Sequence, residues 1–172
     1  MAEPVIPPKA KLFIGILFSD ESLILSAHEI LTKKFGEIDF QTKKIPFAHT
    51  SYYKSMGANL TKVFYSYKKL IRREDIAGIK LFTNGLERRL SGKGERKINI
   101  DPGYITLANV FLATCKDYFH RTYLGRGVYL ENEYRYVGKQ FHPWEWTYPD
   151  YLKPEYIFFF HEVRKIYSTQ IG

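Results

Sequence analysis

Four ionisable residues stand close together in the second half of the chain, Lys116, Asp117, His120 and Arg121. Histidine titrates near neutral pH, so His120 is a candidate general acid or base. Arg121 and Lys116 supply the positive charge that neutralises a phosphate, and Asp117 is a candidate catalytic carboxylate. The structural alternative is that Asp117 and Arg121 pair with each other at the start of a hairpin. The pattern predicts either a phosphate-binding catalytic group or an ion pair.

Asp101 and Tyr104 belong to the sequence Asp101-Pro-Gly-Tyr104, whose residue types are typical of a tight turn. Sites often lie where a strand ends and the chain turns, which makes Asp101 a candidate base or metal ligand and Tyr104 a candidate ligand-binding residue. The alternative role of Asp101 is that of a hydrogen-bond acceptor in an Asx turn. A metal site formed by Asp101, Asp117 and His120 is conceivable, but the other histidines have no second ligand at metal-binding spacing. We therefore predict no metal site.

A third group of residues combines aromatic rings with polar side chains. Thr50 and Tyr52 lie in a polar, aromatic stretch, and Asn84 lies on a predicted helix. Such side chains bind a base or a sugar by stacking and hydrogen bonding. The same argument applies to Trp144 and Trp146, although these rings more simply attach the C-terminal loop to the sheet. We include Thr50, Tyr52 and Asn84 among the predicted ligand-binding residues.

The positive charge of the chain is concentrated in one stretch. The whole chain has 26 Lys and Arg against 18 Asp and Glu, but residues 101–172 hold eight of each kind. The range 62–97 alone holds 11 basic and 4 acidic residues. The positive electrostatic field of such a stretch attracts nucleotides, nucleic acids and acidic proteins. The structural alternative is a solvent-exposed charged surface without a binding role. We expect the stretch to form one rim of a site built by the other half of the chain.

The elements that position these residues follow from apolar periodicity. Over the first 100 residues we expect a strand covered on both faces (12–18), a helix from Ser19-Asp20 to Gly36, strands over 37–47 and 59–70, a helix from Asp75 to Ser91-Gly-Lys-Gly94, and a strand over 97–100. This order, β-α-β-β-α-β, is that of a ferredoxin-like sandwich with two helices on one face of an antiparallel sheet. The predicted fold class is therefore α+β.

The second half of the chain extends this core. The range 106–116 fits helical spacing but also fits a strand, and we favour the helix. A β-hairpin over 119–137 turns at Gly125-Arg-Gly127, and a loop rich in Pro and Trp leads to a last helix that begins near Pro154. Residues 1–10 are expected to be a loose arm. Since no linker interrupts the chain, we predict a single domain over 1–172.

Composition and missing motifs exclude several classes of protein. With 45% hydrophobic and 17% aromatic residues the chain is not disordered, and its single cysteine excludes a disulfide framework. Its apolar runs are too short to span a bilayer and no signal peptide is evident, so we expect a cytoplasmic protein without a membrane partner. The chain lacks a P-loop, a Rossmann glycine cluster, a Gly-x-Ser-x-Gly elbow and a His-Glu-x-x-His motif.

Several longer strings resemble those of one uncharacterised prokaryotic family, known as domain of unknown function 4416. They are Lys11-Leu-Phe-Ile-Gly15, Asn99-Ile-Asp-Pro-Gly-Tyr104, Leu112-Ala-Thr-Cys-Lys-Asp117, His120-Arg-Thr-Tyr-Leu124 and Trp146-Thr-Tyr-Pro-Asp-Tyr151. The resemblance runs over nearly the whole chain. It implies a small cytoplasmic protein with no agreed activity, and it names no cofactor.

Two functional hypotheses follow. The first is binding or processing of a phosphorylated ligand (a nucleotide, a phosphosugar or RNA), with His120 as acid or base and Arg121 as charge stabiliser if the protein is an enzyme. The second is a non-catalytic scaffold or interaction domain that forms a homodimer. Sequence-specific DNA binding is weaker, since no helix-turn-helix or zinc finger is present. Convergence of the polar residues in one concave pocket would favour the first hypothesis.

Overall fold

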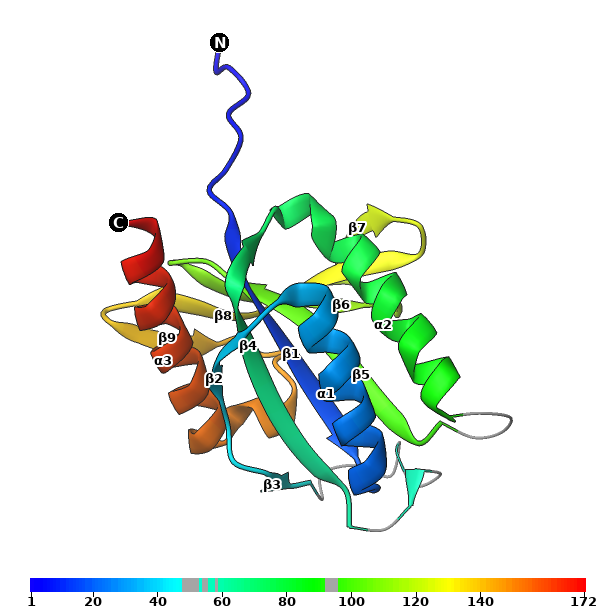
Figure 1. Cartoon of the computed structure of the whole chain (residues 1–172). Helices are drawn as coiled ribbons and strands as arrows, with labels where there is room; N and C mark the ends of the chain where they lie inside the picture. The colour runs from blue at the N-terminus through cyan, green and yellow to red at the C-terminus, as the bar shows by residue number, and fades with distance from the viewer. Residues whose placement is uncertain (48–52, 54–55, 58, 92–95) are drawn as a thin grey trace.

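Figure 1 shows the computed structural model, which describes residues 1–47, 53, 56–57, 59–91 and 96–172. The elements in chain order are β1 (Ala10–Phe18), α1 (Glu21–Phe35), β2 (Ile38–Gln41), β3 (Ile45–Pro46), β4 (Thr61–Ile71), the 3-10 turn η2 (Arg73–Asp75), α2 (Ile76–Ser91), β5 (Ile98–Ile105), β6 (Asn109–Thr114), β7 (Thr122–Gly125), β8 (Val128–Val137), β9 (Gln140–Pro143), the 3-10 turn η3 (Pro149–Leu152) and α3 (Pro154–Ile171). Residues 1–9 form an exposed arm that projects from the body (Figure 1).

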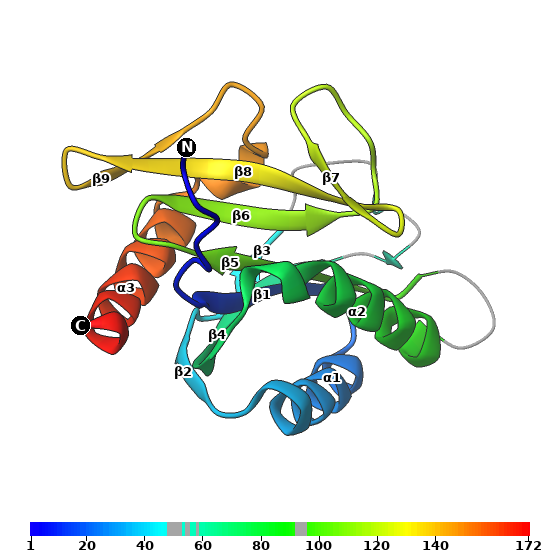
Figure 2. The ribbon, with the colours of Figure 1, turned by 90° about the horizontal axis from the view of Figure 1, so that it is seen from above.

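The described strands form one antiparallel sheet in the order β2-β4-β1-β5-β6-β8-β7, with β3 beside β4 and β9 beside β8. The strands β2, β4, β1 and β5, with α1 and α2 on one face, form the predicted ferredoxin-like core. The strands β6 to β9 widen the sheet, and α3 covers the opposite face (Figure 2). The α+β fold is confirmed, as is the hairpin that joins β7 to β8 at Gly125-Arg-Gly127.

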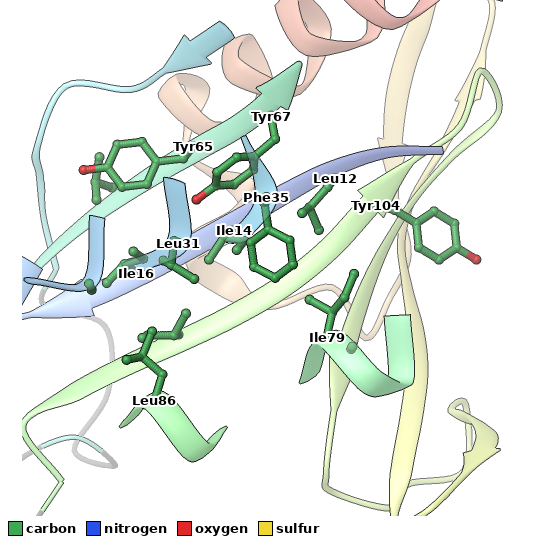
Figure 3. Packing of buried hydrophobic residues seen from close by; sticks show 14 of the residues in the cluster. Leu12, Ile14, Ile16, Leu31, Phe35, Tyr65, Tyr67, Ile79, Leu86 and Tyr104 are labelled. Carbon is green, nitrogen blue, oxygen red and sulfur yellow. The ribbon is translucent and has the colours of Figure 1, made fainter. Parts of the chain in front are cut away.

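Two hydrophobic cores lie on the two faces of the sheet, and β1 contributes to both. Leu12, Ile14 and Ile16 pack against α1 and α2 in the first core (Figure 3). Phe13 points to the other face, where its ring centroid lies 5.1 Å from that of Phe160 on α3. Because both faces are covered, β1 has no polar side chain over residues 12–18, instead of a polar one at every second position.

The ends of α1 follow from its predicted caps. The side chain of Asp20 accepts a hydrogen bond of 2.8 Å from the backbone N–H of Ser22, which satisfies one of the free donors at the start of the helix. Gly36 ends the helix with φ at +93°, a conformation that favours glycine, and its N–H donates to the carbonyl of Thr32. Local sequence thus determines both boundaries.

The helix predicted over 106–116 is wrong. This range holds the strand β6, whose side chains alternate between the two cores: Val110 and Leu112 pack on the side of α3, whereas Phe111 and Ala113 pack on the side of α2. An apolar strand that is buried on both faces has no polar side, so its pattern resembles that of a short helix.

The tight turn predicted at Asp101-Pro-Gly-Tyr104 is also wrong. These residues continue β5, and the turn comes later, where the N–H of Thr106 donates to the carbonyl of Asn109 at 2.9 Å. Pro102 has no N–H that could donate a hydrogen bond to a neighbouring strand. The pairing of β5 with β6 accordingly begins at the next residue, Gly103. The ladder covers only three residue pairs and ends at Ile105. The two strands therefore separate on the side of Asp101.

None of the helices in the described part of the chain has the length and apolar character that a membrane crossing needs.

Candidate functional site: a cavity between β5 and β6

A cavity of about 680 Å³ lies where β5 and β6 separate. Its walls come mainly from the last two thirds of α2, the first half of β5, the end of β6 and the turn η3, with Leu17 of β1 and Lys62 of β4. Volumes of roughly 300–1,000 Å³ are typical of sites for small molecules. Among the described residues, five cations and three carboxylates line the cavity: Lys62, Lys80, Arg88, Arg96 and Lys116, with Glu87, Asp101 and Asp150.

β6 does not pair with β5 at Ile100, and side chains of α2 bind the backbone of Ile100 instead. The N–H of Ile100 donates to Oε1 of Glu87 at 2.6 Å, and its carbonyl accepts from Nζ of Lys80 at 3.4 Å. Lys80 also donates to Oδ1 of Asp101 at 2.8 Å. A backbone group that is buried without a partner is costly. The need to satisfy Ile100 explains why two charged residues lie buried on the inner face of α2.

The electrostatic balance differs between the two carboxylates of this wall. Burial raises the pKa of Asp101, but Lys80, Lys62 and the amide of Asn99 lower it more, so the net pKa lies below its ordinary value. For Glu87, burial and the nearby charge of Asp101 raise the pKa above its ordinary value, although Glu87 also binds Arg96 at 2.7 Å. Asp101 is therefore an ionised carboxylate at neutral pH.

The inner end of the cavity holds a second ion pair. Nζ of Lys62 donates to Oδ2 of Asp150 at 2.6 Å, and each side chain is only 9% exposed. The ammonium of Lys62 also lies 4.7 Å from the ring centroid of Tyr151 and 5.1 Å from that of Phe64. The hydroxyl of Tyr151 is buried and has no hydrogen-bond partner among the described residues. This end of the cavity thus combines polar groups with aromatic walls.

The outer end of the cavity is exposed to solvent and positively charged. Arg88, Cys115 and Lys116 are exposed there, and Nδ2 of Asn84 lies 3.1 Å from Sγ of Cys115. Within the described chain, Arg88 makes no ion pair with a carboxylate. Because Glu87, Asp101 and Asp150 are already paired with Arg96, Lys80 and Lys62, none of these carboxylates neutralises the charge of Arg88.

A polar cluster lies directly behind this wall and contains the predicted catalytic histidine. Glu131, 1% exposed, accepts from Nε of Arg121 at 2.9 Å, and Nε2 of His120 lies 2.7 Å from its other oxygen. Arg121 also donates to the carbonyl of Lys116 and to the hydroxyl of Tyr148, both at 2.9 Å. Since Lys116 and Tyr148 line the cavity, the cluster supports its wall from behind.

The indole rings fix the other side of His120. Its ring lies parallel to that of Trp146, with centroids 4.8 Å apart, and Trp146 lies parallel to Trp144 at 5.2 Å. The guanidinium of Arg135 lies over the ring of Trp144, 4.7 Å from its centroid. Neither tryptophan lines the cavity, in agreement with their predicted structural role.

The structure places the predicted site residues in several locations. Asp101, Lys116 and Asn84 line the cavity, whereas His120 and Arg121 stand behind it. Tyr104 belongs to the first core and lies near Ile76 and Ala77 at the start of α2, outside the cavity. Figure 3 shows it well away from Leu86. Thr50 and Tyr52 lie outside the described residues. The polar group predicted from the sequence is thus divided between the cavity wall, its support and the core.

Asp117 lies outside the cavity as well, exposed and close to Tyr129. The ion pair considered between Asp117 and Arg121 is not formed, because Arg121 binds the buried Glu131 instead. A metal site of Asp101, Asp117 and His120 is not assembled either, since Asp101 binds Lys80 and His120 binds Glu131. No group of three or more histidine, cysteine or carboxylate side chains in the described ranges is arranged to hold a metal ion.

The basic stretch 62–97 does not form one rim, contrary to expectation. Lys62, Lys80, Arg88 and Arg96 line the cavity, but Arg72 follows the far end of β4, where it pairs with Asp75. Ten residues of extended chain separate Lys62 from Arg72, which is about 33 Å. A linear count of charge cannot separate the two ends of one strand.

Sequence reasoning missed the buried charged residues of the site. Lys80 and Glu87 are seven residues apart on the apolar face of α2. Glu131 and Glu133 are two residues apart on β8 and are both buried. A charged residue at a position where the periodicity requires an apolar one is the signal that could have revealed them. Asp150 had no such signal, because η3 lies in an irregular loop.

Comparison with known proteins agrees with the resemblance noted from the sequence. A family model described as Domain of unknown function (DUF4416) matches residues 8–167. The chain belongs to this family. The DUF4416 match extends from the residues before β1 into α3, so every element that lines the cavity lies within the family's domain. Neither curated proteins nor solved structures gave a significant match.

Proposed function

We propose that the cavity between β5 and β6 binds a small phosphorylated molecule. The observation that carries this proposal is Arg88, an exposed guanidinium of the lining that makes no ion pair with a carboxylate of the described residues, whereas Glu87, Asp101 and Asp150 are each paired with another cation. Guanidinium groups bind phosphate through two parallel hydrogen bonds. Phosphate esters of this kind are metabolites of the cytoplasm, where we expect the protein to act.

The size of the site favours a metabolite over a polymer. A volume of 680 Å³ accommodates a mononucleotide or a sugar phosphate. An RNA strand instead needs an open groove that follows its backbone with repeated basic contacts. The cationic ends of β4 lie too far apart to supply such a groove around this cavity.

Asp101 is the candidate base if the protein also processes its ligand. It lines the cavity and remains ionised because Lys80 and Asn99 bind it. His120 reaches the cavity only through Glu131, Arg121 and Tyr148, so its proposed contribution is to hold the wall in place.

Substitution of Arg88 tests the proposal. We expect Arg88→Ala to raise the dissociation constant of a phosphorylated ligand by about tenfold or more, because a hydrogen bond to a charged group contributes roughly 1.5–3 kcal/mol. The measurement is a thermal-shift screen with inorganic phosphate, AMP and ribose 5-phosphate, followed by calorimetry of the ligands that bind. Arg89→Ala is the matched control, because Arg89 is exposed on the same helix but does not line the cavity. An equal loss in both variants, or no stabilisation of the wild type by any phosphate compound, would refute the proposal.

The alternative of a homodimeric interaction domain rests on the edge of the sheet at β7. β7 lies at one end of the strand order, and Tyr118, Phe119 and Tyr123 beside it are 59%, 78% and 59% exposed. An exposed edge strand with apolar side chains can pair with a second chain. On this alternative, Tyr123→Lys should convert a dimer into a monomer in light scattering at increasing protein concentration. A wild type that is monomeric at all concentrations would exclude it.

A further inference from the structure

We propose that the inner end of the cavity recognises the hydroxyl groups of a sugar, so that the ligand is a sugar phosphate. This inference rests on the proposed function and specifies its ligand class. The inner end consists of Lys62, Asp150, Tyr151 and Asn99, all of which line the cavity and are less than 10% exposed. Arg88, by contrast, is an exposed residue of the same lining.

The hydroxyl of Tyr151 is the clearest sign that a polar group of a ligand belongs here. Tyr151 lines the cavity, is 2% exposed, and finds no hydrogen-bond partner for its hydroxyl in the described chain. Native structures satisfy nearly all buried polar groups, and each exception requires an explanation. A ligand hydroxyl that bonds to Tyr151 would supply the missing partner.

The ion pair next to Tyr151 also retains unused hydrogen-bonding capacity. The ammonium of Lys62 has three donors, of which Asp150 uses one. Asp150 accepts this bond through Oδ2, and no described donor binds its other carboxylate oxygen. Lys62 and Asp150 therefore present a donor and an acceptor side by side to the cavity.

A sugar matches this arrangement better than other small groups do. Each hydroxyl both donates and accepts, so two neighbouring hydroxyls can bind Lys62 and Asp150 together. Asp150 already balances the charge of Lys62, whereas no described carboxylate pairs with Arg88, so a phosphate is favoured at Arg88 rather than at the inner end. The cavity is also lined by the rings of Phe47, Tyr148 and Tyr151, which can pack against the C–H face of a sugar.

Tyr151→Phe tests the inference because it removes only the unpartnered hydroxyl. The probes are glucose 6-phosphate and ribose 5-phosphate, compared with phenyl phosphate, AMP and inorganic phosphate in calorimetry. We expect wild type to bind a sugar phosphate at least tenfold more tightly than phenyl phosphate or AMP. We expect Tyr151→Phe to weaken the binding of the sugar phosphate by about two- to tenfold, which is the effect of one hydrogen bond. The binding of inorganic phosphate and the melting temperature should not fall.

Tyr156→Phe is the matched control. Tyr156 is also fully buried with an unpartnered hydroxyl, but it does not line the cavity, so its substitution should leave binding unchanged. If no phosphate compound binds, the proposed function itself fails. If phosphates bind but hydroxyls add no affinity, if AMP binds most tightly, or if Tyr151→Phe has no selective effect, the sugar inference fails and the proposed function stands.

Discussion

Replacing Gly103 by alanine is expected to lower the free energy of unfolding by about 3 kcal/mol or more, which is a large share of the roughly 5–15 kcal/mol that stabilises a typical domain. A Cβ at this position would lie 2.2 Å from the carbonyl oxygen of Phe111 and 2.3 Å from the ring of Phe13. The first contact is with the backbone of β6 and the second with a fully buried ring, so neither can move away without disturbing the sheet. Chemical denaturation monitored by circular dichroism measures the loss.

Gly78→Ala is the control for this substitution. Gly78 lies inside α2, and a Cβ there would meet no atom within 4 Å. Alanine in a helix interior is more favourable than glycine by roughly 0.5–1 kcal/mol, so this variant should be slightly more stable than wild type. A Gly103→Ala protein as stable as wild type would show that β5 and β6 are not packed as closely as described.

The second large effect concerns two buried glutamates of β8, for which the same substitution should have opposite results. Glu131→Gln is expected to cost about 3–5 kcal/mol, because it leaves Arg121 buried without its carboxylate partner. Glu133→Gln is expected to stabilise the protein by about 1 kcal/mol or more at pH 7, because Glu133 is fully buried and no cation among the described residues forms an ion pair with it. Burial and the charge of Glu131 raise the pKa of Glu133 well above its ordinary value.

The pH dependence distinguishes this explanation from a change in packing. Below about pH 4.5, Glu133 is protonated in both the folded and the unfolded chain and has no effect on the free energy of unfolding. Above it, only the unfolded chain ionises, so the contribution of Glu133 destabilises the fold increasingly until the raised folded pKa is reached. The advantage of Glu133→Gln should therefore be small at pH 4 and grow toward pH 8. Urea denaturation of both variants across this range measures it, and a constant difference would contradict the raised pKa.

The ferredoxin-like core was predictable because its elements follow from local patterns. The caps at Asp20 and Gly36 define the first helix, and the continuous apolar run over residues 12–18 defines the central strand, without reference to the rest of the chain. The stretch from Asp101 to Thr114 was not predictable in the same way. A proline-glycine pair favours a turn locally, but here β1 pairs with β5 through both residues and holds them in a strand.

The candidate site shows the same division. Residue types and spacing indicated Asp101, Asn84 and Lys116, which do line the cavity. They also singled out His120 and Arg121, but their shared partner Glu131 lies eleven and ten residues further on and is recognisable only when the hairpin is folded.

The sequence alone determines the order of the core elements and the ends of the first helix. It also shows that the excess of basic residues lies in the first half of the chain. These properties depend on neighbours a few residues apart, for which propensity, capping and charge suffice as reasons. Only the tertiary structure decides that β5 and β6 separate and that Lys80 and Glu87 satisfy the backbone hydrogen bonds of Ile100. It also decides that the basic stretch is divided between the two ends of β4. Those outcomes depend on buried polar groups from distant segments finding each other, because burial makes every unpaired group costly.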